Sequence, residues 1–210
     1  MIKAFLLLFE PVQAWDKVAR AQRSVGMVLL TFLLPMMLLT GAAEGYGLVT
    51  KGKVRKDEGY SSLRKFPLSE AVVYEVGQGL LYVIVALVAA KTLKSLGETF
   101  HGRHSFRQAF TTIAYGLSPL FVARLFDGFP SVNPWTTWTI GIFFCVVVLY
   151  QGLPRVMMPD PPHAFGLYLM NSLLLILITG LTRFVTAWYL SGHFKPVEKV
   201  ISAIAAKLPF

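Results

Sequence analysis

The chain has 210 residues, of which 55% are hydrophobic and 15% charged, and its formal net charge at pH 7 is +9. Soluble domains of this size do not carry long apolar runs separated by short charged loops, so the composition excludes a soluble globular protein. The positive charge does not indicate nucleic-acid binding, because no recognition module accompanies it. The Lys and Arg residues cluster beside apolar segments, where they meet anionic lipid headgroups.

Residues 1–24 are predicted to form an interfacial amphipathic segment ahead of the first apolar run. Pro11 suits the first position of a helix. The apolar residues that recur at helical spacing after it are Val12, Trp15, Val18 and Ala19. Such a helix lies in the plane of the headgroups with Trp15 as its anchor. A solvated helix that packs on a partner is the alternative.

Five apolar stretches follow, and each is close to the roughly 20 residues that a helix needs to cross hydrocarbon. They cover residues 25–49, 68–90, 106–126, 135–153 and 165–190. A backbone in lipid must pair its own N–H and C=O groups, so each stretch is predicted to be a helix. The predicted fold is therefore all-α, a polytopic bundle of five transmembrane helices over residues 25–190.

Local signals add detail to these spans. Pro35 and Pro119 are expected to break the first and third spans. Ser105 and Gln108 form a capping box at the start of the third. Gly41 and Gly45 give the first span a surface of small residues for close helix approach. Residues 50–67 form the longest loop.

Residues 191–210 are predicted to hold an amphipathic C-terminal helix, too short for a sixth span. Its apolar stripe consists of Val197, Val200, Ile201, Ile204, Ala205 and Leu208. It is expected to lie on the membrane or to dock onto another protein. Five spans place the termini on opposite sides, but Lys and Arg are similarly frequent on both, so charge does not fix the orientation.

Ionisable residues fall at similar depth in four of the spans. They are Glu44, Glu75, Arg124, Asp127 and Arg183. A charge at the centre of a membrane helix costs about 2.5–3.5 kcal/mol, so such groups face the bundle and pair. We expect a network in which Arg183 pairs with Glu44 or Glu75, and Arg124 with Asp127 or the remaining glutamate.

Three interpretations of this intramembrane polar network stay open. It is a buried staple that fixes helix register, a path for protons or solutes, or a set of side chains that snorkel without pairing.

A second group of polar residues is predicted at the N-terminal side of the bundle. His101, His104 and His163 lie there with Glu98 and Asp160, and histidine with carboxylate suits a divalent metal. Their spacing matches no known metal signature, and ordinary interfacial histidines are the alternative. No other cofactor is expected.

Motifs of common enzymes do not occur in the sequence. There is no H-E-x-x-H, G-x-S-x-G, P-loop or dinucleotide fingerprint. Cys145, the one cysteine, lies within the fourth stretch and is expected to be a packing residue. The sequence therefore predicts a protein that is not an enzyme.

Several strings along the chain resemble the bacterial branch of the Yip1 family of five-span membrane proteins. They are Phe9-Glu10-Pro11 with Trp15, then Pro35, then Gly102 with Ser105-Phe106-Arg107, then the segment from Ala114 to Leu120, and finally the segment from Tyr150 to Pro154. The resemblance implies a multi-pass protein of the bacterial inner membrane with a cytoplasmic N-terminus. It also implies a non-enzymatic role in membrane organisation or assembly.

These observations lead to two functional hypotheses. The first is a scaffold, assembly or accessory subunit that acts through helix–helix and lipid contacts, with other membrane proteins or further copies of itself as partners. The alternative is a transporter or channel component that uses the ionisable layer of Glu44, Glu75 and Arg183. A continuous polar cavity would favour the alternative, and a solid core with an apolar groove would favour the first.

Overall fold

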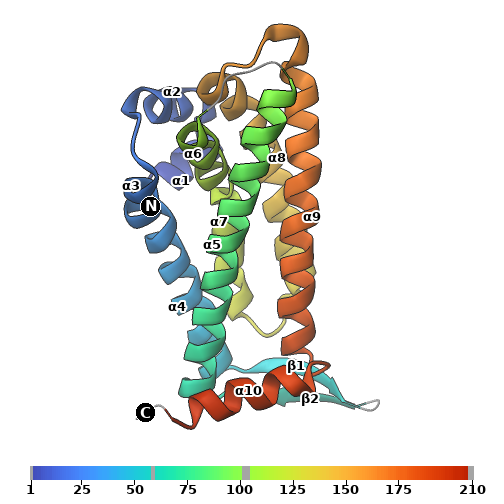
Figure 1. The fold of residues 1–210 in the computed structure, drawn as a ribbon. Coiled ribbons are helices and arrows are strands. Elements are labelled where there is room, and N and C mark those ends of the chain that lie inside the picture. Colours follow the sequence, from blue (N-terminus) through green and yellow to red (C-terminus); the bar gives the residue numbers. More distant parts are fainter. Residues whose placement is uncertain (1, 58–59, 101–104, 208–210) are drawn as a thin grey trace.

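A computed structural model describes residues 2–57, 60–100 and 105–207 of the chain. Within this described part, five helices are long and apolar enough to cross a membrane, and they run side by side (Figure 1). They span Val25–Thr50, Leu68–Thr99, Phe106–Gly128, Pro134–Met157 and Pro161–Leu190. The predicted all-α membrane bundle is confirmed.

The first span is built from α3 (Val25–Val28), a π-helical turn η1 (Leu29–Leu33) and α4 (Leu34–Thr50). The wide turn directly precedes Pro35. Proline has no N–H and its ring crowds the carbonyl one turn earlier, so a locally widened helix accommodates it. The predicted interruption of this span is therefore a π-turn within a continuous helix.

The second span, α5 (Leu68–Thr99), continues well past its predicted end at residue 90. Lys91 and Lys94 are good helix formers, and no proline interrupts the segment. Lys94 also pairs with Glu98 one turn later, at 3.4 Å. The apolar run therefore marks the part of α5 suited to hydrocarbon, whereas the helix itself extends beyond it.

The third span lies at the centre of the bundle, because 83% of its most apolar window is buried, against 28% for the first and fifth spans. It consists of α6 (Phe106–Gly116), α7 (Ser118–Arg124) and a 3-10 turn η2 (Leu125–Gly128). The capping box of Ser105 and Gln108 is confirmed. The break falls just before Pro119, where the Ser118 hydroxyl donates to the Tyr115 carbonyl at 2.7 Å.

The last two spans are α8 (Pro134–Met157) and α9 (Ala164–Leu190), the latter preceded by the 3-10 turn η3 (Pro161–His163). Asn133 caps α8 by accepting a hydrogen bond from the Trp135 N–H at 2.9 Å. The sequence predicted an end at residue 153, but α8 continues through Pro154. A proline this close to a helix end interrupts the helix only locally, so the last turn still forms.

Two short helices, α1 (Ile2–Phe9) and α2 (Pro11–Ala21), lie at the N-terminal end of the bundle (Figure 1). Trp15 is fully buried, and its indole N–H donates to the Val148 carbonyl at 3.0 Å. Gly152 provides the space, because a Cβ there would collide with the indole. The prediction that Trp15 anchors α2 in the headgroups is therefore wrong, since the ring fastens α2 to α8.

The opposite end carries a β-hairpin in the segment predicted to be a loop. Within residues 50–67, β1 (Lys53–Asp57) pairs antiparallel with β2 (Tyr60–Arg64), and Val54 lies opposite Leu63. Helix α10 (Lys195–Ala205) lies at this same end (Figure 1). It is joined to the hairpin by an ion pair of 2.9 Å between Arg64 and Glu198.

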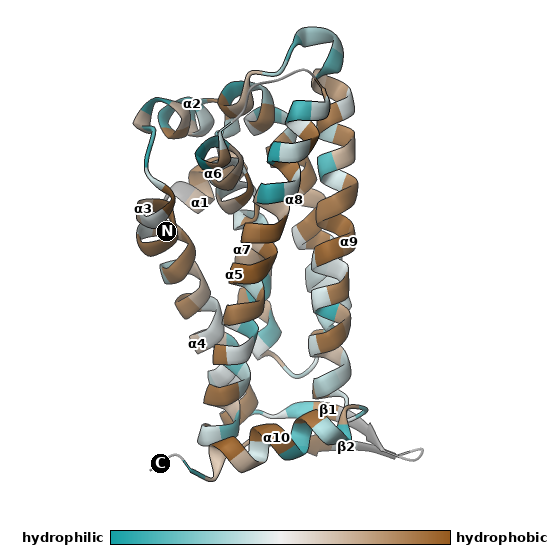
Figure 2. Ribbon diagram, in the orientation of Figure 1, coloured by the Kyte–Doolittle hydropathy of each residue, from teal (hydrophilic) through white to brown (hydrophobic). Residues whose placement is uncertain are grey.

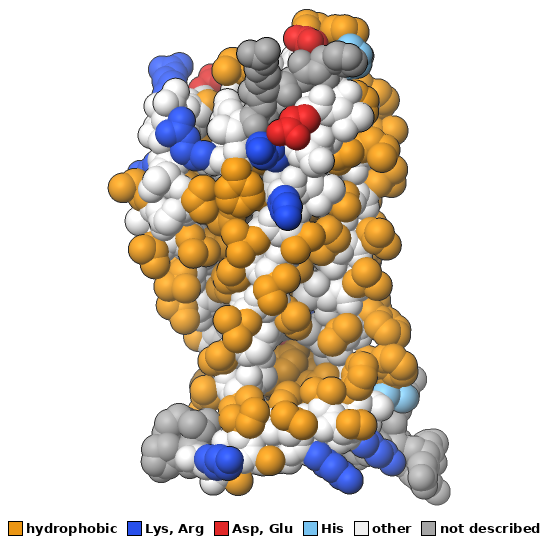
Figure 3. Space-filling model, in the orientation of Figure 1, with side chains coloured by type: hydrophobic (Ala, Val, Ile, Leu, Met, Phe, Trp, Pro, Cys, Tyr) orange, Lys and Arg blue, Asp and Glu red, His pale blue; other side chains and the backbone are white. Residues whose placement is uncertain are grey.

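Hydropathy divides the molecule into a middle and two ends. Brown, apolar residues dominate the helices between the ends in Figure 2. On the face drawn in Figure 3, hydrophobic side chains cover the middle, whereas most Lys, Arg, Asp and Glu side chains gather near the two ends. This distribution is that of a protein whose middle is surrounded by lipid.

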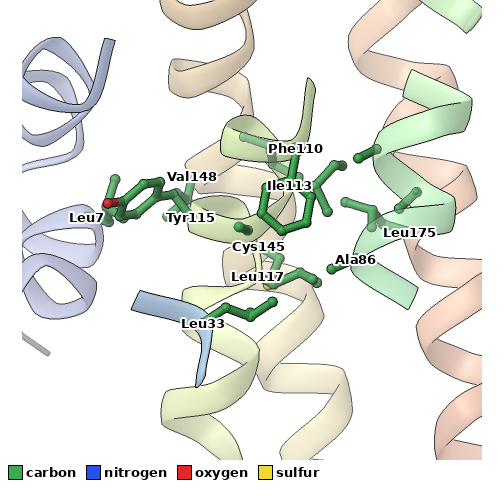
Figure 4. Packing of buried hydrophobic residues seen from close by; sticks show 14 of the residues in the cluster. Leu7, Leu33, Ala86, Phe110, Ile113, Tyr115, Leu117, Cys145, Val148 and Leu175 are labelled. Atoms are coloured by element: carbon green, nitrogen blue, oxygen red, sulfur yellow. The ribbon is translucent and has the colours of Figure 1, made fainter. Parts of the chain in front are cut away.

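Apolar side chains fill the bundle toward the N-terminal end. Ile113, Leu117, Cys145 and Leu175 come from the third, fourth and fifth spans and are fully buried together (Figure 4). Tyr115 lies in the same cluster and tilts against Phe32 with 4.1 Å between ring centroids. The buried charged side chains lie toward the hairpin end; they are Glu44, Lys53, Glu70, Arg124, Asp127 and Arg183.

Candidate functional site

The first group of buried charges surrounds Arg124 at the end of α7. Its Nη2 atom donates to Glu44 Oε2 on α4 at 2.8 Å and also to the side-chain oxygen of Gln78 on α5. The guanidinium lies over the Tyr82 ring, 4.6 Å from the centroid. Glu75 is more distant, since its Oε2 atom lies 4.0 Å from the same nitrogen. Arg124 thus links α4, α5 and α7.

The second group surrounds Arg183 on α9. Its Nη2 atom donates to Asp127 Oδ2 at 2.7 Å and to the Thr137 hydroxyl at 2.9 Å. Its Nε donates to the Pro134 carbonyl at 2.8 Å, and Thr137 in turn donates to Asp127 Oδ1 at 2.6 Å. Both charged side chains are 1% exposed, so this pair is removed from solvent and lipid alike. It links η2, α8 and α9.

The five residues predicted from sequence therefore lie near one another, but their pairing differs from the expectation. Arg183 was expected to pair with Glu44 or Glu75, and it pairs with Asp127. Arg124 pairs with Glu44. The reason is positional: the Asp127 side chain on η2 meets Thr137 of α8 and Arg183 of α9, whereas the Arg124 side chain on α7 meets Glu44 of α4 and Gln78 of α5.

Two glycines allow the backbones to approach closely enough for these pairs to form. A Cβ on Gly47 would overlap the carbonyl of Gly128, and a Cβ on Gly128 would lie 2.5 Å from the carbonyl oxygen of Ala43. The contact brings η2 directly onto α4. Glu44 lies within the same stretch of α4, so close backbone packing sets the distance to Arg124.

The hairpin supplies a third buried cation, in addition to Arg124 and Arg183, at the hairpin end of the network. Lys53 on β1 donates from Nζ to the carbonyls of Asp127, Phe129 and Val132, at 3.0, 3.3 and 3.2 Å. Burial lowers the pKa of Lys53, and the charge of Asp127 acts in the opposite direction. By binding these three carbonyls, the lysine fixes the backbone of the segment that connects α7 to α8.

Polar side chains that the sequence analysis did not single out complete the network. The Tyr74 hydroxyl donates to Glu44 Oε1 at 3.5 Å and accepts from Gln78 Nε2 at 3.2 Å. Thr137 bridges Arg183 and Asp127. Sequence spacing could have revealed Tyr74 and Gln78 as members of the network, because they lie one helical turn apart on the same face of α5.

The network continues toward the surface through aromatic and charged contacts. Tyr74 stacks on Tyr189 with 5.2 Å between ring centroids, and the Tyr189 hydroxyl donates to Glu70 at 3.1 Å. Arg64 contacts Glu70 at 3.3 Å and Glu198 of α10 at 2.9 Å. The hairpin and α10 are therefore connected to the buried charges by a continuous series of contacts.

The histidine site cannot be assembled from the described residues. His101 and His104 lie outside them, whereas His163 lies on η3 with its ring 6.2 Å from that of Phe100. Glu98, one of the two carboxylates considered, pairs with Lys94. The metal hypothesis stays a prediction.

The chemistry of this site is that of charge matching. Glu44, Glu75 and Asp127 supply three acidic groups, and Arg124, Arg183 and Lys53 supply three basic groups. Removing one member of a buried pair leaves the other charge buried without a partner, whereas the intact pair holds its helices in one register. The arrangement defines a polytopic membrane protein whose five spans are cross-linked near one end by buried ion pairs and the hydrogen bonds around them.

Comparison with protein families identifies the chain more specifically. The family model described as the Yip1 domain matches residues 5–184, which is most of the chain. The protein belongs to the Yip1 family, as the resemblance in the sequence implied. Comparisons with curated proteins and with solved structures gave no match.

Proposed function

We propose that this Yip1-family protein is a non-enzymatic scaffold or accessory subunit of a larger membrane assembly. The observation that carries the proposal is the division of the bundle interior. Ion pairs lock the helices near the hairpin, and a buried apolar cluster fills the interior toward the N-terminal end. A rigid bundle of this kind suits binding of neighbours better than turnover of a substrate.

The transport alternative has less support from the same residues. A proton or solute path needs polar groups in succession through the membrane. Between Arg124 and the N-terminal end of the bundle, the interior is occupied by Tyr82 and Phe121, whose ring centroids lie 5.4 Å apart. The apolar cluster of Figure 4 then fills the interior. The apolar cluster therefore favours a structural role for the charges.

The proposal includes the location and orientation of the protein. By family resemblance, we infer that it lies in a bacterial inner membrane with α1 and α2 on the cytoplasmic side. The hairpin and α10 then lie on the outer side, where they offer an ordered surface to other proteins. Lipids contact the exposed apolar flank, as they do for any membrane-embedded bundle.

Native purification tests this role. The tagged protein is extracted from its own membrane in lipid nanodiscs and analysed by native mass spectrometry. We expect a defined complex with another membrane protein at fixed stoichiometry. A lone monomer that persists under the mildest extraction contradicts the proposal.

A flux measurement separates the two hypotheses. The purified protein is reconstituted in vesicles that contain a pH-sensitive dye, with the Glu44→Gln variant as the control. The accessory role predicts equal proton leak for both proteins. A leak that the wild type shows and Glu44→Gln abolishes would support transport.

A further inference from the structure

The flank formed by α4 and α5 carries an apolar groove of about 600 Å³. Its lining runs over residues 34–49 of α4 and 68–83 of α5. The middle of the groove is lined by small residues, namely Gly41, Ala42, Gly45 and Gly79. At these positions little side chain separates the groove from the backbones of α4 and α5.

Glu75 is the acidic residue among those that line this groove, and its carboxylate is incompletely paired. Oε2 lies 4.0 Å from Arg124 Nη2, a nitrogen that already donates to Glu44 at 2.8 Å. Oε1 is buried and accepts no hydrogen bond within the part of the chain that is described. The side chain is 13% exposed. A carboxylate in this position lacks a donor from the groove side.

We propose that the α4–α5 groove binds a transmembrane helix of a partner protein, and that this helix presents a basic side chain to Glu75. The inference rests on the proposed accessory role and names the binding surface and the chemistry of the partner. The partner's cation supplies the donor that Oε1 lacks and completes the charge matching around Arg124 and Glu44.

The dimensions of the groove favour a helix. Its lining extends over about 16 residues of each helix, or about 24 Å of helical rise, which is most of a membrane span. Small residues on the floor permit the close backbone approach that helix packing in lipid requires. A lipid acyl chain would fill apolar volume but offers Glu75 no donor.

Charge argues against a second copy of this chain in the groove. A two-fold dimer through α4 and α5 would bring the two Glu75 side chains toward each other. Like charges in a medium of low dielectric constant repel strongly. A different partner with a cation at this depth has the complementary charge.

A designed peptide tests the proposal directly. The protein is reconstituted in phosphatidylcholine vesicles and carries a fluorophore at a cysteine that replaces Gln13, in a Cys145→Ala background. The probe is a labelled Leu/Ala transmembrane peptide with one Lys at the depth of Glu75. A second peptide with Leu in place of that Lys is the reference. Energy transfer at several peptide-to-lipid ratios gives the association constant.

We expect the Lys peptide to bind the wild type about 3- to 20-fold more tightly than the Leu peptide, the range of polar contacts between membrane helices. Glu75→Gln should remove this difference. Gly79→Leu, whose Cβ would lie 3.4 Å from Met37 Cε on the groove floor, should weaken both peptides. Gly77→Leu is the matched control, because a Cβ there meets nothing within 4 Å, and it should bind like the wild type.

Two results would overturn the proposal. One is equal binding of both peptides to wild type and Glu75→Gln. The other is self-association of the protein that Gly79→Leu abolishes and the Lys peptide does not compete with, since a second copy then occupies the groove. The accessory role fails separately, through a lone monomer in native purification, so the two failures are distinguishable. Thermal unfolding of each variant verifies that it is folded.

Discussion

Arg183 and Asp127 are 56 positions apart in the sequence, yet their side chains form an ion pair of 2.7 Å at 1% exposure each. Asp127 lies on the short turn η2 that ends the third span, and Arg183 lies within α9. The pair therefore sets how the central span and the last span are positioned against each other. Hydrogen bonds from Arg183 to the Pro134 carbonyl and the Thr137 hydroxyl bring α8 into the same unit.

Removing one member of this pair should destabilise the bundle strongly. Arg183→Met leaves Asp127 buried without its cation, and we expect the free energy of unfolding to fall by about 3–5 kcal/mol. Denaturant titration in bicelles measures the loss. The double variant Arg183→Met with Asp127→Asn should lose less than the sum of the single variants, because neither partner is then left charged.

The exposed pair of Lys94 and Glu98 serves as the control for this cycle. Its side chains are 41% and 57% exposed, and surface ion pairs contribute about 0–1 kcal/mol. Lys94→Met should therefore change stability little. Strict additivity of the two substitutions at Arg183 and Asp127 would show that the buried groups do not interact.

Gly47→Leu tests the close approach of α4 to η2. A side chain at Gly47 would collide with the Gly128 backbone, which cannot rotate away. We expect a loss of about 1–3 kcal/mol in the free energy of unfolding, as for other overpacked interfaces. Gly26→Leu, in the same span and open to its surroundings, should be near neutral. Equal thermal stability of the two variants would contradict this role of Gly47.

Trp15→Ala should release α2 from the bundle. The substitution removes a fully buried ring and its bond to the Val148 carbonyl, at a cost of about 3–5 kcal/mol. Limited proteolysis near Gln22 should become faster, because α2 then opens locally. Gly152→Val should act similarly by displacing the indole. Phe9→Ala, at a residue that is 80% exposed, is the control and should leave the cleavage rate unchanged.

Cysteine labelling tests the odd number of spans. In a Cys145→Ala background, Gln13→Cys reports on α2 and Lys199→Cys on α10, since both residues are exposed. A membrane-impermeant maleimide added to intact cells should label one position, and inverted vesicles should label the other. Under the proposed orientation, Lys199→Cys is the one labelled in intact cells. Labelling of both positions from the same side would contradict a five-span topology.

The positions of the spans could be predicted from the sequence because hydropathy and length are properties of consecutive residues. The first, second and third spans begin where they were expected, and the capping box at Ser105 forms as predicted. The ends were less accurate. Helix α5 extends past residue 90 and α8 passes through Pro154, because a helix does not stop where its apolar run stops.

The candidate site was predicted in part. The five charged residues were expected in one leaflet, and the structure brings them near one another, but Arg183 pairs with Asp127 instead of a glutamate. Depth along a span can be counted from the sequence. The direction in which a side chain points around the bundle depends on how the helices are rotated, and that follows from contacts such as Gly47 against Gly128.

The sequence by itself determined that this protein lies in a membrane, which family it belongs to and where its five spans lie. In lipid, every long apolar segment must form a helix, because only then are its backbone N–H and C=O groups hydrogen-bonded. Only the tertiary structure decided which charges pair, that Trp15 lies inside the bundle, and that residues 50–67 contain a hairpin. These features depend on contacts between residues far apart in the chain, and such contacts exist only once the helices have packed.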